Sequence, residues 1–347
     1  MRPLRCAAWV GCGALLGLLG CLMNVDENLW TYDAASCKKP PCDGGVPDGR
    51  IDSGPPRCRW APVSMETEAD LNAIWGSSSS DIWIAGDHGA MFHHTGSGWK
   101  SVAPVLDRDL YAIHGTAKDN ILAVGAEGTI LRYNGTAWSA VTAPGNAILL
   151  GVFAASSGDA WAVGSSGAVY RIQGASATQE TSSTTATLRD VWGSSPDDIW
   201  AVGDGGVIIH FTAGKWSSAT SGTTARLQAI AGTGPADVWV VGDCTDKPGR
   251  CPSTILHYNG SAWSKAFTTP DGVSLKALCP VGGQVWSVGH GCCGNSCTCD
   301  HALRYDGSAW SSAAFGHADT LEGVWGTGSC DLWAVGNDGT VLRYLFQ

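Results

Sequence analysis

Charged side chains are scarce in this chain, and the protein classes that depend on them do not fit it. Asp, Glu, Lys and Arg make up only 15% of the 347 residues, which is too few for a coiled coil or a charge-rich disordered chain. Basic residues number 21 against 31 acidic ones, giving a net charge of −10. Because nucleic-acid-binding proteins usually have a basic excess, we expect no nucleic-acid partner.

Long hydrophobic runs are also missing, except at the N-terminus. Residues 6–19 are apolar and follow two arginines, which is typical of a signal peptide rather than of a transmembrane helix. The run LLGC that ends at Cys21 resembles a bacterial lipobox. That resemblance implies removal of residues 1–20 and lipidation of Cys21, and an ordinary signal peptide cleaved nearby is the alternative. We expect an exported protein that is held on the outer membrane of the cell envelope only by this lipid.

Large apolar side chains are almost missing from residues 37–58. The stretch CKKPPCDGGVPDGRIDSGPPRC is dense in proline, glycine and aspartate. Such a composition cannot bury enough apolar surface to offset the entropy cost of ordering the chain. We therefore predict a flexible tether over residues 21–57, followed by one folded domain over residues 58–347.

Motifs of known catalytic chemistry are absent as well. The chain has no GxSxG, no HExxH and no GxxxxGK[ST] sequence, which mark nucleophile elbows, zinc proteases and phosphate-binding loops. Carboxylates are plentiful, but they recur at fixed intervals, so none can be assigned to a glycosidase pair. The sequence therefore identifies no catalytic residue and leaves open whether the protein is an enzyme.

Glycine and tryptophan are in excess, with 47 and 17 residues, and both belong to a repeated sequence. Its clearest copy is LRDVWGSSPDDIWAVGDGGVIIHFTAGKW at residues 188–216. Each copy has four short apolar or β-branched runs, named strands A to D here, which turn residues separate. Four strands in about 40 residues are the size of one β-propeller blade. Seven copies open at Leu71, Leu110, Leu150, Leu188, Leu227, Leu275 and Leu321.

The two ends of the repeated region complete one another. The seventh copy stops after strand C, whereas Trp60 lies 11 residues before Leu71, at the spacing of a strand D tryptophan. Residues 58–65 can therefore supply the missing outer strand of the last blade and hide open sheet edges. We predict a monomeric, all-β, seven-bladed β-propeller of four-stranded blades, with strand A innermost and residues 58–65 closing the ring.

Polar residues that recur in every copy are predicted to belong to the scaffold. Strand B begins with an acid or an amide, and strand C has a histidine or arginine near its end, so we expect a polar bridge in each blade. We expect the strand B tryptophans to pack between blades, and the glycines that end strand B to adopt positive φ. The bridge pairs are Asp81–His93, Asn120–Arg132, Asp159–Arg171, Asp198–His210, Asp237–His257, Gln284–Arg304 and Asp331–Arg343.

Two copies contain insertions between strands B and C, and these give the functional signal. They are DCTDKPGRCPS at 243–253 and HGCCGNSCTCDH at 290–301. In a propeller the B–C turns and the D–A connections share one rim, so insertions in neighbouring blades should lie side by side there. The acids of the other B–C turns favour a cationic or metal-assisted ligand on this rim. Those acids are Asp87, Glu127, Asp204 and Asp338. The candidate binding residues are Asp243, Asp246, Lys247, Arg250, His290, Asn295, Asp300 and His301.

The cysteines predict disulfides, because an exported protein is in an oxidising compartment. The predicted pairs are Cys37–Cys42, Cys244–Cys251, Cys58–Cys330, and Cys292 or Cys293 with Cys297 or Cys299. Cys58 begins the closing strand and Cys330 lies in the A–B turn of the same blade, so their bridge would lock the ring if the two Cα atoms come within ~7 Å. Cys279 is left over, and we expect it to be a buried thiol.

A metal site is the alternative for the second insertion. Its soft or borderline ligands are His290, Cys292, Cys293, Cys297, Cys299 and His301. Zinc or copper would accept four of them. The spacing CCxxxCxC is not that of a zinc ribbon, so we predict disulfides and no cofactor.

The phrase WGSSPDDIWAVGDGG at residues 192–206, with its six relatives, resembles the repeats of bacterial β-propeller lipoproteins, especially of the myxobacterial type. It is more loosely similar to sialidase-type repeat propellers and photosystem II assembly-factor propellers. The sialidase Asp-box SxDxGxTW is absent, so sialidase activity is not implied. The resemblance implies a membrane-anchored extracytoplasmic lipoprotein, which we expect to act as a binding scaffold for an envelope protein or a glycan. The alternatives are an enzyme acting on a polysaccharide or small molecule at the channel mouth, and a metal-binding envelope protein.

Overall fold

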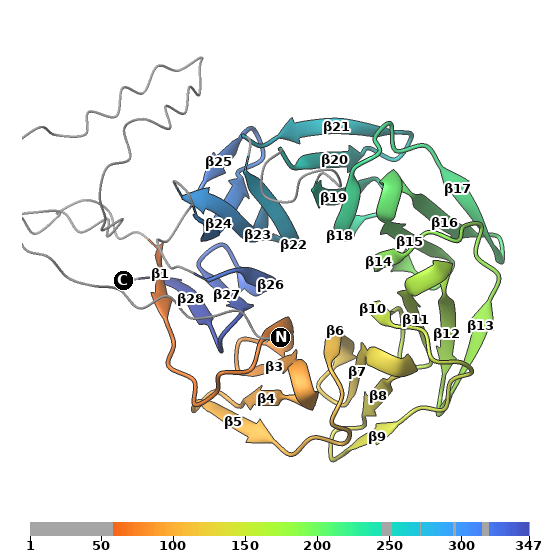
Figure 1. Cartoon of the computed structure of the whole chain (residues 1–347), viewed down its shortest axis with the longest axis horizontal. Coiled ribbons are helices and arrows are strands. Elements are labelled where there is room, and N and C mark those ends of the chain that lie inside the picture. The colour runs from red at the N-terminus through yellow and green to blue at the C-terminus, as the bar shows by residue number, and fades with distance from the viewer. Residues whose placement is uncertain (1–57, 244–251, 271, 294–295, 314–318, 347) are drawn as a thin grey trace, which may run out of the picture. The chain divides into compact units, whose positions relative to one another are not determined.

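Each of the seven copies folds as one four-stranded antiparallel sheet. The computed structural model describes residues 58–243, 252–270, 272–293, 296–313 and 319–346. Figure 1 shows these sheets as blades around a common axis. The prediction of an all-β, seven-bladed propeller is confirmed. No helix in the described ranges is long and apolar enough to cross a membrane.

The strands follow the order A to D within each copy, and short 3-10 turns join strands B and C in four blades. Strands A are β2 (Leu71–Ser78), β6 (Leu110–Ala117), β10 (Leu149–Ala154), β14 (Leu188–Ser195), β18 (Arg226–Gly234), β22 (Val273–Val281) and β26 (Leu321–Gly328). Strands B are β3 (Asp81–Gly86), β7 (Asn120–Gly125), β11 (Asp159–Gly164), β15 (Asp198–Gly203), β19 (Asp237–Asp243), β23 (Gln284–Cys293) and β27 (Asp331–Gly336). Strands C are β4 (Met91–His94), β8 (Ile130–Tyr133), β12 (Val169–Gln173), β16 (Ile208–Thr212), β20 (Thr254–Tyr258), β24 (Ser296–Tyr305) and β28 (Val341–Phe346). Strands D are β5 (Trp99–Val102), β9 (Trp138–Ala140), β13 (Ser176–Glu180), β17 (Lys215–Ala219), β21 (Trp263–Thr268), β25 (Trp310–Ser312) and β1 (Cys58–Pro62). The 3-10 turns are η1 (Asp87–Gly89), η2 (Ala126–Gly128), η3 (Ser165–Gly167) and η4 (Asp204–Gly206).

The first strand of the propeller completes the last sheet. Strand β1 pairs antiparallel with β28, and Trp60 lies opposite Tyr344. The sheet order β1-β28-β27-β26 places it at the outer edge of the seventh blade. A disulfide joins Cys58 to Cys330, with 5.6 Å between their Cα atoms. The predicted ring closure and the predicted Cys58–Cys330 bridge are both confirmed.

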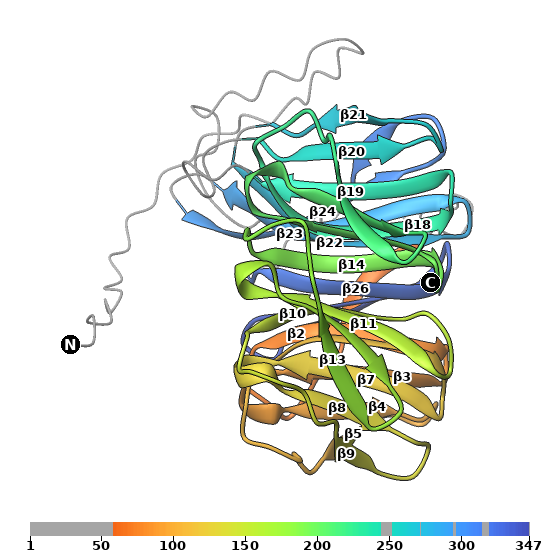
Figure 2. The ribbon, with the colours of Figure 1, turned by 90° about the vertical axis from the view of Figure 1, so that its right-hand side faces the viewer.

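Strand A is the innermost strand of each blade, as predicted. In Figure 1 strands such as β6, β10 and β14 lie nearest the axis, and strands such as β9, β13 and β17 form the outer wall. Figure 2 shows strands running across the disc from one face to the other, so every turn lies on one of two rims. The propeller therefore has two rims, one formed by the B–C turns and D–A connections and the other by the A–B and C–D turns.

The strand B tryptophans form the hydrophobic core between blades. Trp83 is 2% exposed and meets Trp138 of the next blade edge-on, with ring centroids 5.3 Å apart. Trp333 of the seventh blade meets Trp99 of the first blade edge-on as well, with ring centroids 5.4 Å apart. Edge-to-face aromatic pairs at this distance add to the stabilisation from buried area. The prediction that these tryptophans serve packing is confirmed.

The opening leucine of the third copy is Leu149, not Leu150 as predicted. Leu149 pairs with Gly164 as Leu71 pairs with Gly86, and it is fully buried. Two leucines stand next to each other here, so the hydrophobic pattern alone does not distinguish the core position from its neighbour. Leu150 is therefore the second residue of strand β10 and is only half-buried.

The glycines that end strand B are needed for close packing rather than for positive φ. Gly86 has an extended backbone, with φ −157°. A Cβ atom built on it would lie 2.2 Å from the carbonyl oxygen of Asp70. Positive φ occurs instead two residues later, at His88, where φ is 54°. The prediction of positive φ at the strand B glycines is therefore wrong. Glycine recurs there because a Cβ atom would collide with backbone.

Candidate functional site

The polar bridge between strands B and C is present in six of the seven blades. In each of these blades a side-chain hydrogen bond or ion pair links the two predicted partners. The distances are 2.6 Å for Asp81–His93, 3.0 Å for Asn120–Arg132, 2.6 Å for Asp159–Arg171, 2.6 Å for Asp198–His210, 2.8 Å for Asp237–His257 and 3.3 Å for Asp331–Arg343. In the sixth blade Gln284 instead accepts a hydrogen bond from Trp286 Nε1 (3.2 Å), and its bridge to Arg304 is not seen among the described contacts.

These bridges are part of the blade structure and not a reactive site. His210 stacks on Trp200 with ring centroids 3.6 Å apart, so its ring is fixed between a carboxylate and an indole. The hydrogen bond from Arg171 holds the pKa of Asp159 below its usual range. A carboxylate that is stabilised in its charged form is a poor general acid. The residues that vary between blades are therefore the better candidates.

The B–C turns and the D–A connections meet on one rim, which we call the B–C rim. The N–H of Asp87 donates to the carbonyl of Asp70 (2.9 Å), and the N–H of Asp338 donates to the Asp70 carboxylate (2.9 Å). Acids outnumber bases on this rim. The described acids are Glu66, Glu68, Asp70, Asp87, Asp107, Asp109, Glu127, Asp204, Asp243, Asp319, Glu322 and Asp338, and the described bases are Arg108, Arg189, Arg226 and Lys276. The excess of acids makes the rim electronegative, which favours cationic ligands.

The residue after the opening leucine of each strand A lies at the B–C rim end of the innermost strand, and this position is called the mouth position here. Unlike the neighbouring positions of the repeat, it is different in every blade. The seven residues are Asn72, Tyr111, Leu150, Arg189, Gln228, Lys276 and Glu322. Such variation on a repeated frame is expected where the surface has a specific role and not a structural one.

Mouth residues pair with the residue that follows the strand B glycine of the same blade. Asn72 Nδ2 donates to Asp87 Oδ1 (2.8 Å), and Gln228 Nε2 donates to Asp243 Oδ2 (3.1 Å). Lys276 is different, because its Nζ lies 3.6 Å from Glu322 Oε1 in the next blade. Burial raises the pKa of the Glu322 carboxyl, although Lys276 opposes that shift.

Asp243, one of the predicted binding residues, is the most deeply buried acid of the rim. It ends strand β19 and is 5% exposed. Its Oδ2 accepts hydrogen bonds from Gln228 and from Ser274 Oγ (3.1 Å). Its Oδ1 is buried and has no hydrogen-bond partner, which holds for no other buried carboxylate oxygen in the described part of the chain. A buried acceptor without a partner is costly to the folded state.

The second insertion is not a loop but a continuation of strands β23 and β24. His290 lies opposite Asp300, and Gly289 opposite His301, so the inserted residues extend the antiparallel ladder outward from the blade. On its other side His290 lies opposite Ser274, which donates to Asp243. Ser274 of strand β22 thus contacts both Asp243, the first residue of the first insertion, and His290, the first residue of the second insertion.

The two described histidines of this hairpin are neutral at pH 7. Burial lowers the pKa of His290, and the nearby charge of Lys276 lowers it further. Burial alone lowers the pKa of His301. Nδ1 of His290 and Nε2 of His301 are buried and have no hydrogen-bond partner. The remaining predicted residues of the first insertion and the hairpin tip, Asp246, Lys247, Arg250 and Asn295, lie outside the described residues, as do Cys244 and Cys251.

Two titratable groups deeper in the channel wall serve to join blades. The residue two positions after the opening leucine is alanine or glycine in six blades and Asp190 in the fourth. The N–H of Ile230 in the fifth blade donates to Asp190 Oδ2 (2.9 Å). Burial raises the Asp190 pKa to about 7. His114 accepts a hydrogen bond from Ala154 N–H (3.1 Å), and burial lowers its pKa to about 4. Both side chains are engaged with backbone, so neither is free to act on a ligand.

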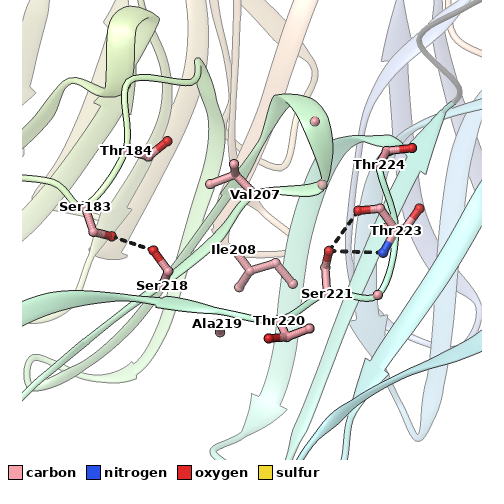
Figure 3. Close-up of a pocket in the computed structure, with 13 residues that line it drawn as sticks. Ser183, Thr184, Val207, Ile208, Ser218, Ala219, Thr220, Ser221, Thr223 and Thr224 are labelled. Atoms are coloured by element: carbon pink, nitrogen blue, oxygen red, sulfur yellow. Dashed lines mark hydrogen bonds between the residues drawn. The ribbon is translucent and has the colours of Figure 1, made fainter.

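A cavity of about 780 Å³ lies outside the channel, on the B–C rim of the fourth blade. Figure 3 shows its lining of short hydroxyl side chains. Their hydroxyls take part in local contacts, such as Ser218 with Ser183 (3.2 Å) and Ser221 with the Thr223 carbonyl (3.2 Å). No charged or aromatic side chain lines it. The cavity therefore offers little that would select a particular ligand.

The described residues support one of the cysteine predictions besides the ring-closing disulfide. Cys279 is a free, buried thiol, and burial raises its pKa to about 12. No group of three or more metal-ligating side chains occurs among the residues that the structure describes. Cys21, Cys37 and Cys42 lie outside these residues, and the side chains of Cys292, Cys293, Cys297 and Cys299 are not described. Lipidation, these disulfides and the metal alternative stay predictions.

The sequence did not identify the partners of Asp243. Ser274 and Gln228 lie in regular strands, and insertion length gives no signal for them. An alignment of the seven copies would have found Asp190, because an acid replaces a small residue there.

The fold and the rim define a β-propeller scaffold. No protein-family model and no curated protein sequence matches the chain. The structure of YCF48 bound to a D1 peptide is 18% identical, with a TM-score of 0.63 over 83% of this chain and 97% of that chain. YCF48 from Cyanidioschyzon merolae is also 18% identical, with a TM-score of 0.62 over 83% and 98%. A streptogramin B lyase structure is 13% identical, with a TM-score of 0.67 over 84% and 98%. At these identities the likeness shows the propeller fold, which agrees with the loose similarity to assembly-factor propellers.

Proposed function

We propose that the protein is a lipid-anchored, extracytoplasmic propeller scaffold that holds a protein partner on its B–C rim. The repeated polar groups are used inside the blades, where they bridge strands B and C. The residues that differ between blades gather at the channel mouth instead. A rigid frame with a varied, electronegative mouth suits recognition better than catalysis.

One observation supports this proposal above the others. Asp243 accepts hydrogen bonds from Gln228 and Ser274 at the end of strand β19, where the first insertion begins, and it keeps an unpaired buried oxygen. Buried polar groups are normally hydrogen-bonded, so an unpaired one calls for a functional explanation. The structure of YCF48 with a D1 peptide is a precedent for a propeller of this shape that binds a peptide.

Site-specific photo-crosslinking in cells tests the proposal. A photoreactive amino acid replaces Asp338, which is exposed on the B–C rim, or Asp306, which is exposed on the opposite rim. We expect a defined crosslinked partner from Asp338 and none from Asp306. The matched pair controls for expression and for random encounters in the envelope. Equal crosslinking from both positions, or crosslinking only from Asp306, would contradict the assignment of the rim.

A further inference from the structure

Asp204 and Asp243 occupy equivalent places in successive blades, and their surroundings differ in charge. Each follows the glycine that ends strand B. Asp204 accepts hydrogen bonds from Arg189, with 3.2 Å between Nη2 and Oδ2, and Arg226 Nε lies 3.4 Å from its Oδ1. The fourth blade therefore surrounds its rim carboxylate with two guanidinium groups.

The next blade has neutral residues at the two corresponding positions. The residue after the opening leucine is Arg189 in the fourth blade and Gln228 in the fifth. The second arginine at Asp204 is Arg226, which precedes the opening leucine of the fifth blade. The corresponding residue for Asp243 is Ser274, which precedes the opening leucine of the sixth blade. Gln228 and Ser274 both donate to Oδ2 of Asp243 (3.1 Å each), so Oδ1 is left without the partner that Arg supplies to Asp204.

Hydration stabilises the carboxylate of Asp243 less than that of Asp204. The Asp204 side chain is 35% exposed, whereas Asp243 is 5% exposed. A buried carboxylate without a cation is strongly destabilising, because the desolvation cost is not recovered. Among the residues that the structure describes, the more buried of the two equivalent acids is thus the one without a counter-charge.

The described cationic side chains near Asp243, Lys276 and His290, do not provide this charge. Lys276 is paired with Glu322 of the next blade (3.6 Å). His290 is close enough to interact with Asp243, but burial and Lys276 lower its pKa, so its imidazole is uncharged at pH 7. The described surroundings of Asp243 contain hydrogen-bond donors, but no cation directed at Oδ1.

We propose that Asp243 is the anchor of a site that takes a guanidinium group, presented by an arginine side chain of the protein partner. The inference rests on the proposed function and names the chemistry of its contact. The incoming guanidinium occupies the role that Arg189 and Arg226 fill at Asp204. One of its N–H groups donates the charge-assisted hydrogen bond that Oδ1 lacks, and a guanidinium is more weakly hydrated than an ammonium, so it enters a buried site more readily. Because Oδ1 is buried, binding includes a local opening of the rim around Gln228.

Titration of the full chain with three capped tripeptides tests the site. The probes are acetyl-Gly-Arg-Gly-amide, its lysine equivalent and its neutral citrulline equivalent. We expect binding of the arginine peptide, weaker binding of the lysine peptide and none of the citrulline peptide. Calcium and zinc salts alone serve as further probes, because a buried carboxylate next to imidazoles could take a metal ion instead.

Three variants separate the site from the general charge of the rim. Asp243→Asn keeps the shape and removes the charge, and we expect it to weaken the arginine peptide about tenfold or more. Gln228→Arg installs the cation of the fourth blade, so it should block binding while raising Tm by about 2–4 °C. Glu127→Gln removes the same charge from an exposed acid that pairs with Arg108 (2.8 Å), and binding should stay within about twofold.

Unchanged peptide binding in both Asp243→Asn and Gln228→Arg would overturn the site. So would a metal ion that binds in an Asp243-dependent way while the arginine peptide does not bind. If the crosslinking experiment succeeds and these titrations fail, the scaffold stands and the guanidinium site falls. If the titrations succeed and no rim partner is crosslinked, the site stands without the proposed partner.

Discussion

Cys58 and Cys330 are joined by a disulfide across a sequence separation of 272 residues. The bond ties the first strand of the propeller to the sheet that contains the last one. It lies beside the pairing of β1 with β28, so covalent and hydrogen-bonded closure occur in the same blade. A bond that closes so long a loop restricts the unfolded chain strongly.

The double variant Cys58→Ser/Cys330→Ser should lose roughly 3–5 kcal/mol of unfolding free energy, because its unfolded state is no longer constrained. Equilibrium urea denaturation under oxidising conditions measures the difference. Cys279→Ala is the control for removing a cysteine, and it should cause a smaller change that reductant does not affect. An unchanged midpoint in the double variant would show that strand pairing alone closes the ring.

Close packing between innermost strands can be tested with two glycines of one strand. A Cβ atom on Gly232 would lie 2.8 Å from Trp192 of the preceding blade, whereas nothing lies within 4 Å of one on Gly234. We expect Gly232→Ala to destabilise the propeller by about 1–3 kcal/mol and Gly234→Ala to change it by less than about 0.5 kcal/mol. Thermal or urea unfolding of both variants measures this contrast, and equal effects would contradict the packing argument.

Asp190 should make the stability of the propeller depend on pH. Its pKa is about 7 in the folded protein and ~3.9 in an unfolded chain. Between these values the folded state holds a proton that the unfolded state has lost, so stability falls as the pH rises from about 4 to about 7. We expect a slope of at most about 1.4 kcal/mol per pH unit, because a single proton is taken up.

The variant Asp190→Ala, which introduces the residue found at Ala73 and Ala112, should lack this part of the pH dependence. Denaturant unfolding of wild type and variant across the same pH range gives the difference directly. Parallel curves for the two proteins would mean that Asp190 does not bind a proton in this range.

Lipidation at Cys21 is tested by expression with a labelled fatty acid. We expect label on the wild-type protein and on Cys12→Ser, which removes a cysteine of the signal peptide, and none on Cys21→Ser. The unlabelled variant should no longer fractionate with membranes. Label that persists in Cys21→Ser would place the anchor elsewhere or remove it from the proposal.

Repetition explains why the fold could be predicted from the sequence. Seven copies of the same pattern average out local ambiguity, and the unmatched Trp60 at one end identified the strand missing at the other. The ambiguity reappears within a single copy. Leu149 and Leu150 are equally hydrophobic, and only the pairing with Gly164 shows which of them is in the core.

The candidate site could be predicted only in part, because its members come from two kinds of segment. Asp243 and His290 were identified since they flank insertions. Ser274 and Gln228 complete the surroundings of Asp243, but they belong to ordinary strands, and their role depends on contacts between blades. The sequence placed the second insertion between strands B and C, but it did not show that the inserted residues extend the ladder of β23 and β24.

The shared blade of β1 and β28 also sets the order in which the protein can fold. The strand that is synthesised first finds its neighbours only when the final strands have been made, so six sheets can form before the seventh. Contacts between such distant segments slow folding, and the open intermediate presents an unpaired edge at each end. In an oxidising compartment the Cys58–Cys330 bond then makes this last step hard to reverse.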